Sequence, residues 1–355
     1  MSTISRTPHI LSVGTAVPPV SFTQELAGRM LAAKTAKAQR FFQHKHIHTR
    51  HLLLPDGVAT GEILREETPA DLRKKFLKHA PLLIAEATRK ALKKASLSLQ
   101  DVDFLACVTS TGFAVPGLSA LTVAELGMKP STQRLDIVGM GCNAGLNGLS
   151  SVAQWCASHP EKVGLLICCE LCSCLYTLDD SENAALVNSL FGDGVAVAVI
   201  RNTEGTDAHQ PRILGFASHM IPESLPLLRF DFEKEKSRYS FYVDKKTPET
   251  LGREIQQPLV QLLKQTGLHR EQIRHWIVHS GGAAILDALE KQIGLAPKDL
   301  RHTRSVLRDY GNVSSGSFLF SYERLLAEGV VKPQDYGIMV TMGPGLTIEM
   351  AAVQW

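Results

Sequence analysis

The segment that most constrains the fold of this chain is an apolar run that ends in a glycine turn at residues 141–145. The run Asp136-Ile-Val-Gly-Met leads into Gly-Cys142-Asn-Ala-Gly, and apolar residues at helical spacing follow from Leu146 onward. This order predicts a strand, a sharp turn that the glycines permit, and then a helix. Such a strand-turn-helix unit is typical of parallel sheets that are covered by helices.

The same alternation of short apolar runs and helical patterns continues along the chain. Buried strands are predicted, among others, at 104–110, 134–138, 192–200, 213–219, 275–279, 337–342 and 346–353. Helical spacing lies between such runs, for example at 248–266 and 283–293. The alternation predicts an α/β fold whose sheet is mostly parallel and covered by helices.

The chain also divides into two parts. Residues 203–210 are polar and resemble a linker, which predicts an N-terminal half at 1–205 and a C-terminal half at 206–355. Phe191-Gly-Asp-Gly-Val-Ala-Val, near the end of the first half, parallels Met342-Gly-Pro-Gly-Leu-Thr-Ile in the second. This echo is too short to establish a duplication by itself.

Composition excludes several classes of function. The 355 residues are 44% hydrophobic and 21% charged, with a formal charge of +3. These values are ordinary for a soluble globular protein and give no case for binding nucleic acid or membrane. The first residues lack a signal-peptide pattern, and no apolar run approaches the roughly 20 residues of a membrane span. We therefore predict a cytoplasmic protein.

The cysteines are confined to one region of the chain. All seven lie between Cys107 and Cys174, and their odd number predicts free thiols in a reducing compartment. The crowded segment 168–174 suggests a metal site, but no second Cys or His pair follows at a ligand spacing. No metal is therefore predicted, and we interpret the segment as a buried strand that runs into a pocket loop.

Cys142 is the candidate nucleophile. At a strand-to-helix turn its sulfur faces the first free N–H groups of the helix, which predicts a stabilised thiolate and a lowered thiol pKa. The competing interpretation is a buried structural cysteine, because most free cysteines are buried. Other parts of the chain have to decide between the two.

Two later segments supply the partners that a thiolate needs. The short strand 276–279 delivers His279 into a glycine turn, and Asn312 precedes another helical run. Histidine can share a proton with a thiol and then stabilise an oxyanion, and an amide can complete the oxyanion hole. A surface histidine and a helix-capping asparagine are the alternatives. Since Cys, His and Asn each lie at an element end beside glycine, we predict that they form one site.

Five short motifs occur in one order over most of the chain: Gly-Cys142-Asn-Ala-Gly, Leu-Phe191-Gly-Asp-Gly, His279-Ser-Gly-Gly, Tyr-Gly-Asn312-Val-Ser-Ser and Gly343-Pro-Gly-Leu. Together they resemble the chalcone synthase-like type III polyketide synthases. Within that family, the segments 138–147 and 187–194 look most like the bacterial dihydroxyphenylacetyl-CoA synthases. Those enzymes build their product from malonyl-CoA alone.

The resemblance implies a fold and an activity. The fold would be the thiolase fold, with two similar α/β halves in five αβαβα layers, the active site between them and a homodimer around the assembly. The substrates would be malonyl-CoA and possible acyl-CoA starters, with no cofactor. Cys142 would hold the acyl chain, while His279 and Asn312 stabilise the enolate of decarboxylated malonyl-CoA. Repeated condensation and cyclisation would give a dihydroxyphenylacetyl-CoA type tetraketide.

The resemblance also assigns residues to a substrate pocket. Phe191 and Phe241 match an aromatic gate, although ordinary core packing competes as an explanation for any phenylalanine. The cavity for the acyl chain and its cyclisation is assigned to Ser110, Cys172, Leu175 and Ser314. The first three of these are threonines in the plant enzymes, so plant-type aromatic starters do not follow from the family.

CoA binding is assigned to a basic segment and to one helix start. Lys45, His48 and Arg50 fall where the family places basic residues against the CoA phosphates, with a solvated basic surface as the alternative. Ala284 follows the glycine turn and is expected to contact the CoA arm through its backbone.

Two other functions compete with this hypothesis. A ketoacyl synthase III-like enzyme would perform a single condensation on an acyl carrier protein. A non-catalytic thiolase-fold protein would bind CoA or a partner, but a scaffold has no need for the Cys, His and Asn set. A degradative thiolase would need a second catalytic cysteine near its C-terminus, and no cysteine follows Cys174.

Overall fold

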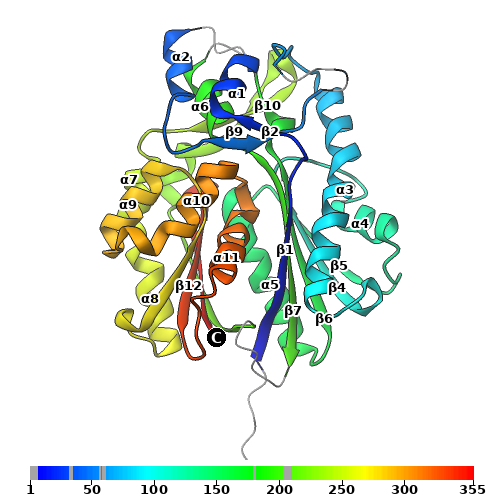
Figure 1. Ribbon diagram of the computed structural model, residues 1–355, viewed down its shortest axis with the longest axis vertical. Helices are drawn as coiled ribbons and strands as arrows, with labels where there is room; N and C mark the ends of the chain where they lie inside the picture. The colour runs from blue at the N-terminus through cyan, green and yellow to red at the C-terminus, as the bar shows by residue number, and fades with distance from the viewer. Residues whose placement is uncertain (1–6, 32–34, 56, 58–60, 179–180, 204–209) are drawn as a thin grey trace, which may run out of the picture.

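The computed structural model describes residues 7–31, 35–55, 57, 61–178, 181–203 and 210–355 (Figure 1). The strands are β1 (Thr7–Ala16), β2 (Ser21–Thr23), β3 (Thr49–His51), β4 (Val102–Thr109), β5 (Gln133–Val138), β6 (Val163–Leu171), β7 (Asp193–Thr203), β8 (Arg212–Met220), β9 (Leu228–Glu233), β10 (Arg238–Val243), β11 (Ile273–Val278), β12 (Tyr336–Gly343) and β13 (Thr347–Gln354). The α-helices are α1 (Gln24–Met30), α2 (Ala36–Phe41), α3 (Pro69–Lys94), α4 (Leu118–Leu126), α5 (Ala144–Ser158), α6 (Glu182–Leu190), α7 (Thr247–Glu254), α8 (Gln256–Thr266), α9 (Ala283–Ile293), α10 (Arg301–Tyr310) and α11 (Ser317–Glu328).

The principal strands connect in the order β11-β12-β13-β8-β1-β7-β6-β4-β5. The halves join where β1 and β8 lie side by side, through the single pair His9 and Arg212. Beyond β1, β7 is antiparallel to both of its neighbours, while β6, β4 and β5 run parallel. Beyond β8, β13 is antiparallel to both neighbours, while β12 and β11 run parallel. Strand order and direction therefore repeat on the two sides of the junction. The sheet was predicted to be mostly parallel, and this prediction is wrong, because β7 and β13 run antiparallel to both of their neighbours and β1 and β8 pair antiparallel.

The repeat explains the sequence echo. The two echoing segments lead into β7 and β13, which occupy corresponding places in the two halves. The predicted boundary between residues 205 and 206 lies outside the described residues, so its exact position stays a prediction.

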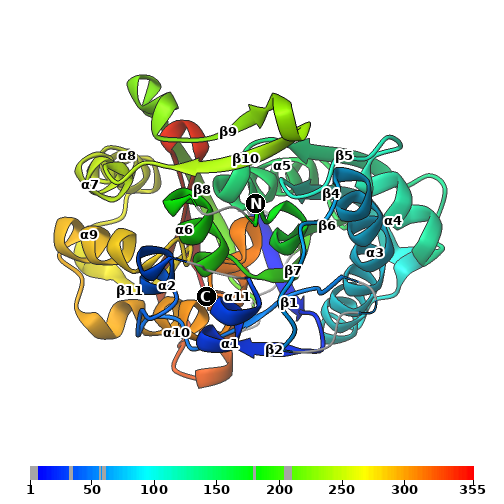
Figure 2. The same ribbon diagram turned by 90° about the horizontal axis from the view of Figure 1, so that it is seen from above.

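Helices complete five layers. α5 and α11 lie in the middle, where α5 packs against strands of both halves and α11 contacts β1, β7 and β11 (Figure 1). α3 and α4 cover the outer face of the first half, and α7 to α9 cover the second (Figures 1 and 2). This αβαβα order agrees with the fold that the motifs predicted. It buries the N-terminal ends of α5 and α11 near each other, because both helices start toward the same end of the molecule.

Strand burial follows the position of each strand in the sheet. β6 is buried along its whole length, as its nearly continuous apolar run Val163–Leu171 requires of a central strand. β5 was predicted to be buried, and this prediction is wrong for the single chain. β5 is the edge strand, with exposed and half-buried residues alternating along Gln133–Val138. Edge strands have only one neighbour, so their outer side stays open.

A cover of short elements lies over one end of the layers. It contains α1, α2, α6, the β2–β3 pair and the β9–β10 hairpin, all visible at the top of Figure 1 and in front in Figure 2. An apolar cluster under this cover includes Phe22, Tyr176, Phe191, Cys142 and Cys172. The cover thus encloses the turn that carries the candidate nucleophile. Among the described residues, no helix is long and apolar enough to cross a membrane.

Candidate active site

Cys142 lies in a tight turn between β5 and α5. The turn is a short 3-10 helix, Gly141–Asn143, which runs directly into α5. Gly141 has a φ of 71° there, and a Cβ at this position would lie 2.3 Å from Cδ of Pro344. Both the left-handed backbone and the close approach exclude other residues. The glycine-rich loop at Pro344 and the nucleophile turn are therefore fitted to each other.

His279 and Asn312 reach the same place from the second half. His279 follows β11, and Asn312 lies between α10 and the start of α11. Both side chains are almost fully buried, with 2% of each residue exposed. The Asn312 amide Nδ2 donates to the carbonyl of Gly281, 3.4 Å away, so the amide lies against the turn that follows His279.

Ser314 contacts all three predicted catalytic residues. Its Oγ is 3.5 Å from the sulfur of Cys142, and its N–H donates to Oδ1 of Asn312 at 2.8 Å. Its backbone carbonyl hydrogen-bonds the His279 ring. Ser314 has a φ of 48°, in the left-handed region that costs a non-glycine residue energy. The turn at Ser314 is thus the point where the three segments converge.

Burial sets the charge state of the nucleophile. It raises the pKa of the Cys142 thiol to about 12, and the nearby carboxylate of Glu170 raises that pKa further. The hydroxyl of Ser314 and the amide of Asn312 lower it, but by less. The lowered thiol pKa expected from the helix start is therefore wrong for the resting site, since desolvation outweighs the helix N–H groups.

The predicted base is also uncharged. Burial lowers the pKa of His279 to about 3, against the opposing effect of the Ser314 carbonyl. Burial therefore favours the uncharged form of both the thiol and the imidazole.

Glu170 is a buried acid that sequence reasoning did not select. It lies on β6, none of it is exposed, and burial raises its pKa. Ser315 Oγ donates to it at 2.6 Å, Ser314 Oγ at 3.3 Å and the Ser110 N–H at 3.0 Å. The only available signal was a lone acidic residue inside an otherwise apolar strand. Such a residue needs hydrogen-bond partners, and these come from distant segments.

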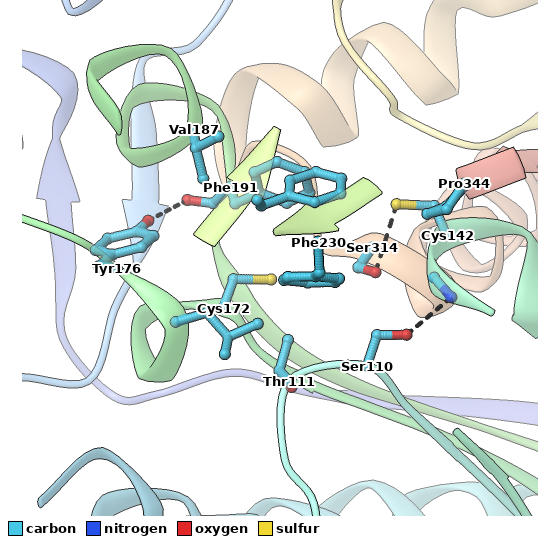
Figure 3. A pocket seen from close by; sticks show the side chains of 13 residues that line it. Ser110, Thr111, Cys142, Cys172, Tyr176, Val187, Phe191, Phe230, Ser314 and Pro344 are labelled. Carbon is cyan, nitrogen blue, oxygen red and sulfur yellow. Dashed lines mark hydrogen bonds between the residues drawn. The ribbon is translucent and has the colours of Figure 1, made fainter. Parts of the chain in front are cut away.

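The predicted pocket residues come together in one cavity (Figure 3). Ser110, Cys172 and Ser314 line it next to Cys142, and Figure 3 shows the contacts of Ser314 with Cys142 and of Ser110 with the turn. Leu175 lines the same cavity, as do both predicted gate residues. The structure thus groups all six predicted pocket residues around the sulfur, although it does not test their roles.

The two predicted gate residues belong to an aromatic cluster with Phe230. Phe191 and Phe241 meet edge to face, with ring centroids 5.4 Å apart at 75°. Phe230 packs on Phe241 at 4.9 Å and was missed by the sequence prediction. The signal was present, because Phe230 and Phe232 alternate in Leu-Arg-Phe-Asp-Phe-Glu as residues of a strand do. The pairing of β9 with β10 places Phe230 opposite Phe241.

The cavity beside Cys142 is small but adjoins a larger hollow. Its volume is about 40 Å³, close to that of a single water molecule. The hollow beside it measures about 840 Å³ and shares the lining residues Ser110, Thr111, Leu175, Phe230 and Pro344. A chain longer than a few atoms must therefore extend past these shared residues.

The residues predicted to bind CoA differ in their exposure to solvent. Lys45, His48 and Ala284 are exposed, and their proposed roles remain predictions. Arg50 is fully buried, and the structure contradicts its predicted contact with CoA phosphates. Its Nη1 donates to the carbonyls of Asn188 and Phe191, each at 2.6 Å. A guanidinium enclosed in this way binds the backbone at the end of α6, and a CoA phosphate in solvent cannot reach it.

Arg50 in fact supports the backbone that joins the gate to Asn312. Tyr176 also donates to the Phe191 carbonyl, as Figure 3 shows. The Gly192 N–H donates to the Asn312 carbonyl at 3.0 Å, and the Asn312 N–H donates to the Leu190 carbonyl at 2.9 Å. The gate and the amide side chain of the site therefore share one backbone connection.

Comparison with known proteins agrees with this geometry. Residues 5–204 match the family described as chalcone and stilbene synthases, N-terminal domain, and residues 216–354 match the C-terminal domain of the same family. The chain is 45% identical, over all of its length and 95% of the relative's, to a 3,5-dihydroxyphenylacetyl-CoA synthase of Amycolatopsis balhimycina. It is 46% identical, over 98% of its length and 90% of the relative's, to the enzyme of that name from Streptomyces toyocaensis.

Solved structures show the same architecture. The type III polyketide synthase 1,3,6,8-tetrahydroxynaphthalene synthase of Streptomyces coelicolor superposes with a TM-score of 0.87 at 29% identity, covering 98% of this chain and 99% of that one. PKS-I of the brown alga Ectocarpus siliculosus superposes with a TM-score of 0.90 at 25% identity, covering both chains completely. The predicted family and fold are thereby confirmed. The chain belongs to the chalcone and stilbene synthase family and is a type III polyketide synthase with the thiolase fold.

Proposed function

We propose that this enzyme condenses malonyl-CoA units iteratively on Cys142 and cyclises the product to a dihydroxyphenylacetyl-CoA type tetraketide. The observation that carries the reaction is the meeting of Cys142, His279 and Asn312 around Ser314, beside the cavity that Cys142 and Ser314 line. The product assignment is supported by the two relatives, 45% and 46% identical, that are named 3,5-dihydroxyphenylacetyl-CoA synthases.

Loading begins with a neutral thiol. The Cys142 sulfur attacks the thioester carbonyl of the starter while His279 takes the thiol proton. The new S–C bond forms, the bond to the CoA sulfur breaks, and the proton leaves with the CoA thiol. Concerted proton transfer suits a pair whose charged forms are both disfavoured by burial.

Extension needs a stabilised enolate. Malonyl-CoA loses CO₂, and the electron pair of the broken C–C bond moves onto the thioester oxygen. The Asn312 Nδ2 and an N–H of the His279 ring are the donors proposed for that oxygen. The enolate carbon then attacks the Cys142-bound acyl group, and the bond from that group to the Cys142 sulfur breaks. The chain is now two carbons longer and attached to CoA, and it returns to Cys142 for the next round as the CoA thiol leaves. No step requires a cofactor or a metal. Loss of CO₂ supplies the electron pair of the enolate, and proton transfers balance the remaining charges.

Chain growth is proposed to follow the larger hollow. A cavity of about 40 Å³ cannot hold a tetraketide, whereas the adjoining hollow of about 840 Å³ can. Ser110 and Leu175, which line both spaces, would then contact the growing chain. Lys45, His48 and Ala284 remain the candidates for holding the CoA portion outside.

A homodimer is part of the proposal. Several large apolar side chains are exposed on the single chain, including Phe113 (74%) and Val115 (77%). Phe113 also lines the larger hollow, as do the partly exposed Val138, Met220 and Tyr239. Apolar side chains that gather in this way are typical of an interface, and a second copy would cover both them and the edge strand β5.

Isotopically labelled malonyl-CoA supplied as the only thioester tests the proposal. We expect a cyclic C₈ thioester labelled in every two-carbon unit, detected by mass spectrometry. A single β-ketoacyl product that requires a carrier protein would favour the ketoacyl synthase III-like alternative. Product formed only after an aromatic or long-chain acyl-CoA is added would contradict the malonyl-CoA starter while leaving the family unchanged.

A further inference from the structure

Ser317 contacts His279 at Nδ1, one of its two ring nitrogens. It is the first residue of α11, and none of it is exposed. Its Oγ hydrogen-bonds Nδ1 of His279 and also accepts the Ser280 N–H at 3.2 Å. Because Nδ1 is engaged in this way, Nε2 is the ring nitrogen left for the reaction.

The surroundings of Nε2 agree with a role of this nitrogen in the reaction. A Cβ at Gly281 would lie 3.1 Å from Nε2, so this nitrogen lies against the Gly281 backbone. The Asn312 amide donates to the carbonyl of the same glycine. Nε2 and the Asn312 amide thus both lie next to Gly281, and these are the two donors of the proposed oxyanion site.

A serine hydroxyl has one O–H donor and two acceptor lone pairs. At Ser317 the Ser280 N–H occupies one lone pair. The O–H and the other lone pair remain for Nδ1 of His279. The hydroxyl can therefore donate to a bare Nδ1 or, after rotating, accept from an Nδ1–H.

The proposed reaction needs both arrangements. During loading, Nε2 must offer a lone pair to the thiol proton, so the neutral ring carries its proton on Nδ1. During decarboxylation, a neutral ring must donate from Nε2, so Nδ1 is bare. Because the Ser280 N–H already occupies one lone pair of Ser317 Oγ, the hydroxyl proton is free to point at Nδ1, which favours the second arrangement.

We propose that the Ser317 hydroxyl is a positioning residue that makes the Nε2–H form of His279 available by donating to Nδ1. This inference rests on the proposed function, because it assigns the two forms to loading and to decarboxylation. Ser317 touches no substrate and acts only through the imidazole.

Three variants isolate the hydroxyl. Ser317→Ala removes it, and Ser317→Thr restores it on a side chain with one more methyl group. Ser321→Ala is the matched control, because Ser321 lies one turn further along α11, is equally buried and bonds only the carbonyls of Val278 and Ser317. Thermal unfolding of each variant reports whether the fold is retained.

The kinetic test separates the two steps. Ser317→Ala should lower kcat for CO₂ release from malonyl-CoA by about tenfold or more, with KM within about twofold. Alkylation of Cys142 by iodoacetamide should stay within about twofold, because a ring that has lost the hydroxyl donor can still carry its proton on Nδ1 and accept the thiol proton at Nε2. Ser317→Thr should recover decarboxylation, and Ser321→Ala should match the wild type. Equal losses in both steps, or equal losses in Ser317→Ala and Ser321→Ala, would overturn the proposal.

A spectroscopic test does not depend on turnover. In protein with ¹⁵N-labelled histidine, the His279 signals are identified by their loss in His279→Gln. The wild type should show a population with the proton on Nε2, and Ser317→Ala should shift it toward Nδ1. An unchanged tautomer ratio would overturn the proposal even if activity falls. A wild type that releases no CO₂ from malonyl-CoA would instead contradict the proposed function, and the tautomer ratio would still decide the role of Ser317.

Discussion

Cys142 and His279 are both enclosed by protein, and burial favours the uncharged form of each residue. The pKa of the thiol is raised to about 12, so its thiolate fraction should increase about tenfold with each pH unit through neutral and mildly alkaline pH. We therefore expect alkylation of Cys142 by iodoacetamide to accelerate steadily from pH 6 to pH 10, measured by peptide mass spectrometry.

The variant Cys142→Ala serves as the control for that experiment and should show no adduct at this position. It should also abolish acyl loading and product formation while leaving the fold intact. A rate that is already level above pH 6.5 would contradict the neutral pair and indicate a preformed thiolate–imidazolium pair instead. An acyl adduct that persists in Cys142→Ala, or that maps to Cys172, would refute the choice of nucleophile.

Asn312 has two functions that one substitution can separate. Its Oδ1 accepts the Ser314 N–H and shapes the turn, while its Nδ2 is the proposed oxyanion donor. Asn312→Asp keeps the first and removes the second, so decarboxylation should fall by about 10²–10³. The new carboxylate is buried and faces the Gly281 carbonyl, so the variant should also lose stability, which denaturant titration measures in parallel. The release of ¹⁴CO₂ from labelled malonyl-CoA measures the rate. Wild-type decarboxylation in this variant would remove Asn312 from the site.

At the scale of elements, the end of α6 depends on a single buried cation. Arg50→Met would leave the Asn188 carbonyl and the Gln24 side-chain oxygen without their arginine donor, although Tyr176 still donates to the Phe191 carbonyl, and a buried unsatisfied group costs about 1–3 kcal/mol. We expect the free energy of unfolding to drop by about 3 kcal/mol in denaturant titrations.

The exposed Lys45 provides the contrast to Arg50. Lys45→Met should change stability by less than about 0.5 kcal/mol, as is usual for surface substitutions. If Lys45 binds CoA phosphate, its substitution should raise KM for malonyl-CoA and leave kcat unchanged. A stability loss equal to that of Arg50→Met would contradict the assignment of Lys45 to the surface and of Arg50 to the core. An unchanged KM for malonyl-CoA would remove Lys45 from the CoA site.

At the scale of the whole molecule, the exposed apolar residues around the larger hollow predict a stable homodimer. Light scattering after gel filtration should give about twice the chain mass of 38.8 kDa. Val115→Asp places a charge among these residues and should favour the monomer, whereas Val260→Asp, on the exposed side of α8, should not. A monomeric wild type at micromolar concentration would contradict the prediction.

Much of this protein follows from its sequence. The helix-covered α/β fold follows from alternating apolar runs and helical patterns, since these periods reflect which residues can face a core. The five αβαβα layers were predicted from the family resemblance. The Cys142, His279 and Asn312 set was recognisable because each residue lies beside a glycine at an element end. The pocket residues, from Ser110 to Ser314, were identified by family resemblance, and the structure places them together in one cavity.

Only the tertiary structure decided the charges and contacts of these residues. A sequence shows that Arg50 is basic, but its burial depends on α6 and Tyr176, which lie far along the chain. The pKa of Cys142 depends on the depth of its cavity and on Glu170, and the proton position on His279 depends on Ser317 across the α11 interface. Charge and protonation respond to desolvation and to hydrogen bonds between distant segments, and these arise only when the two halves close on each other.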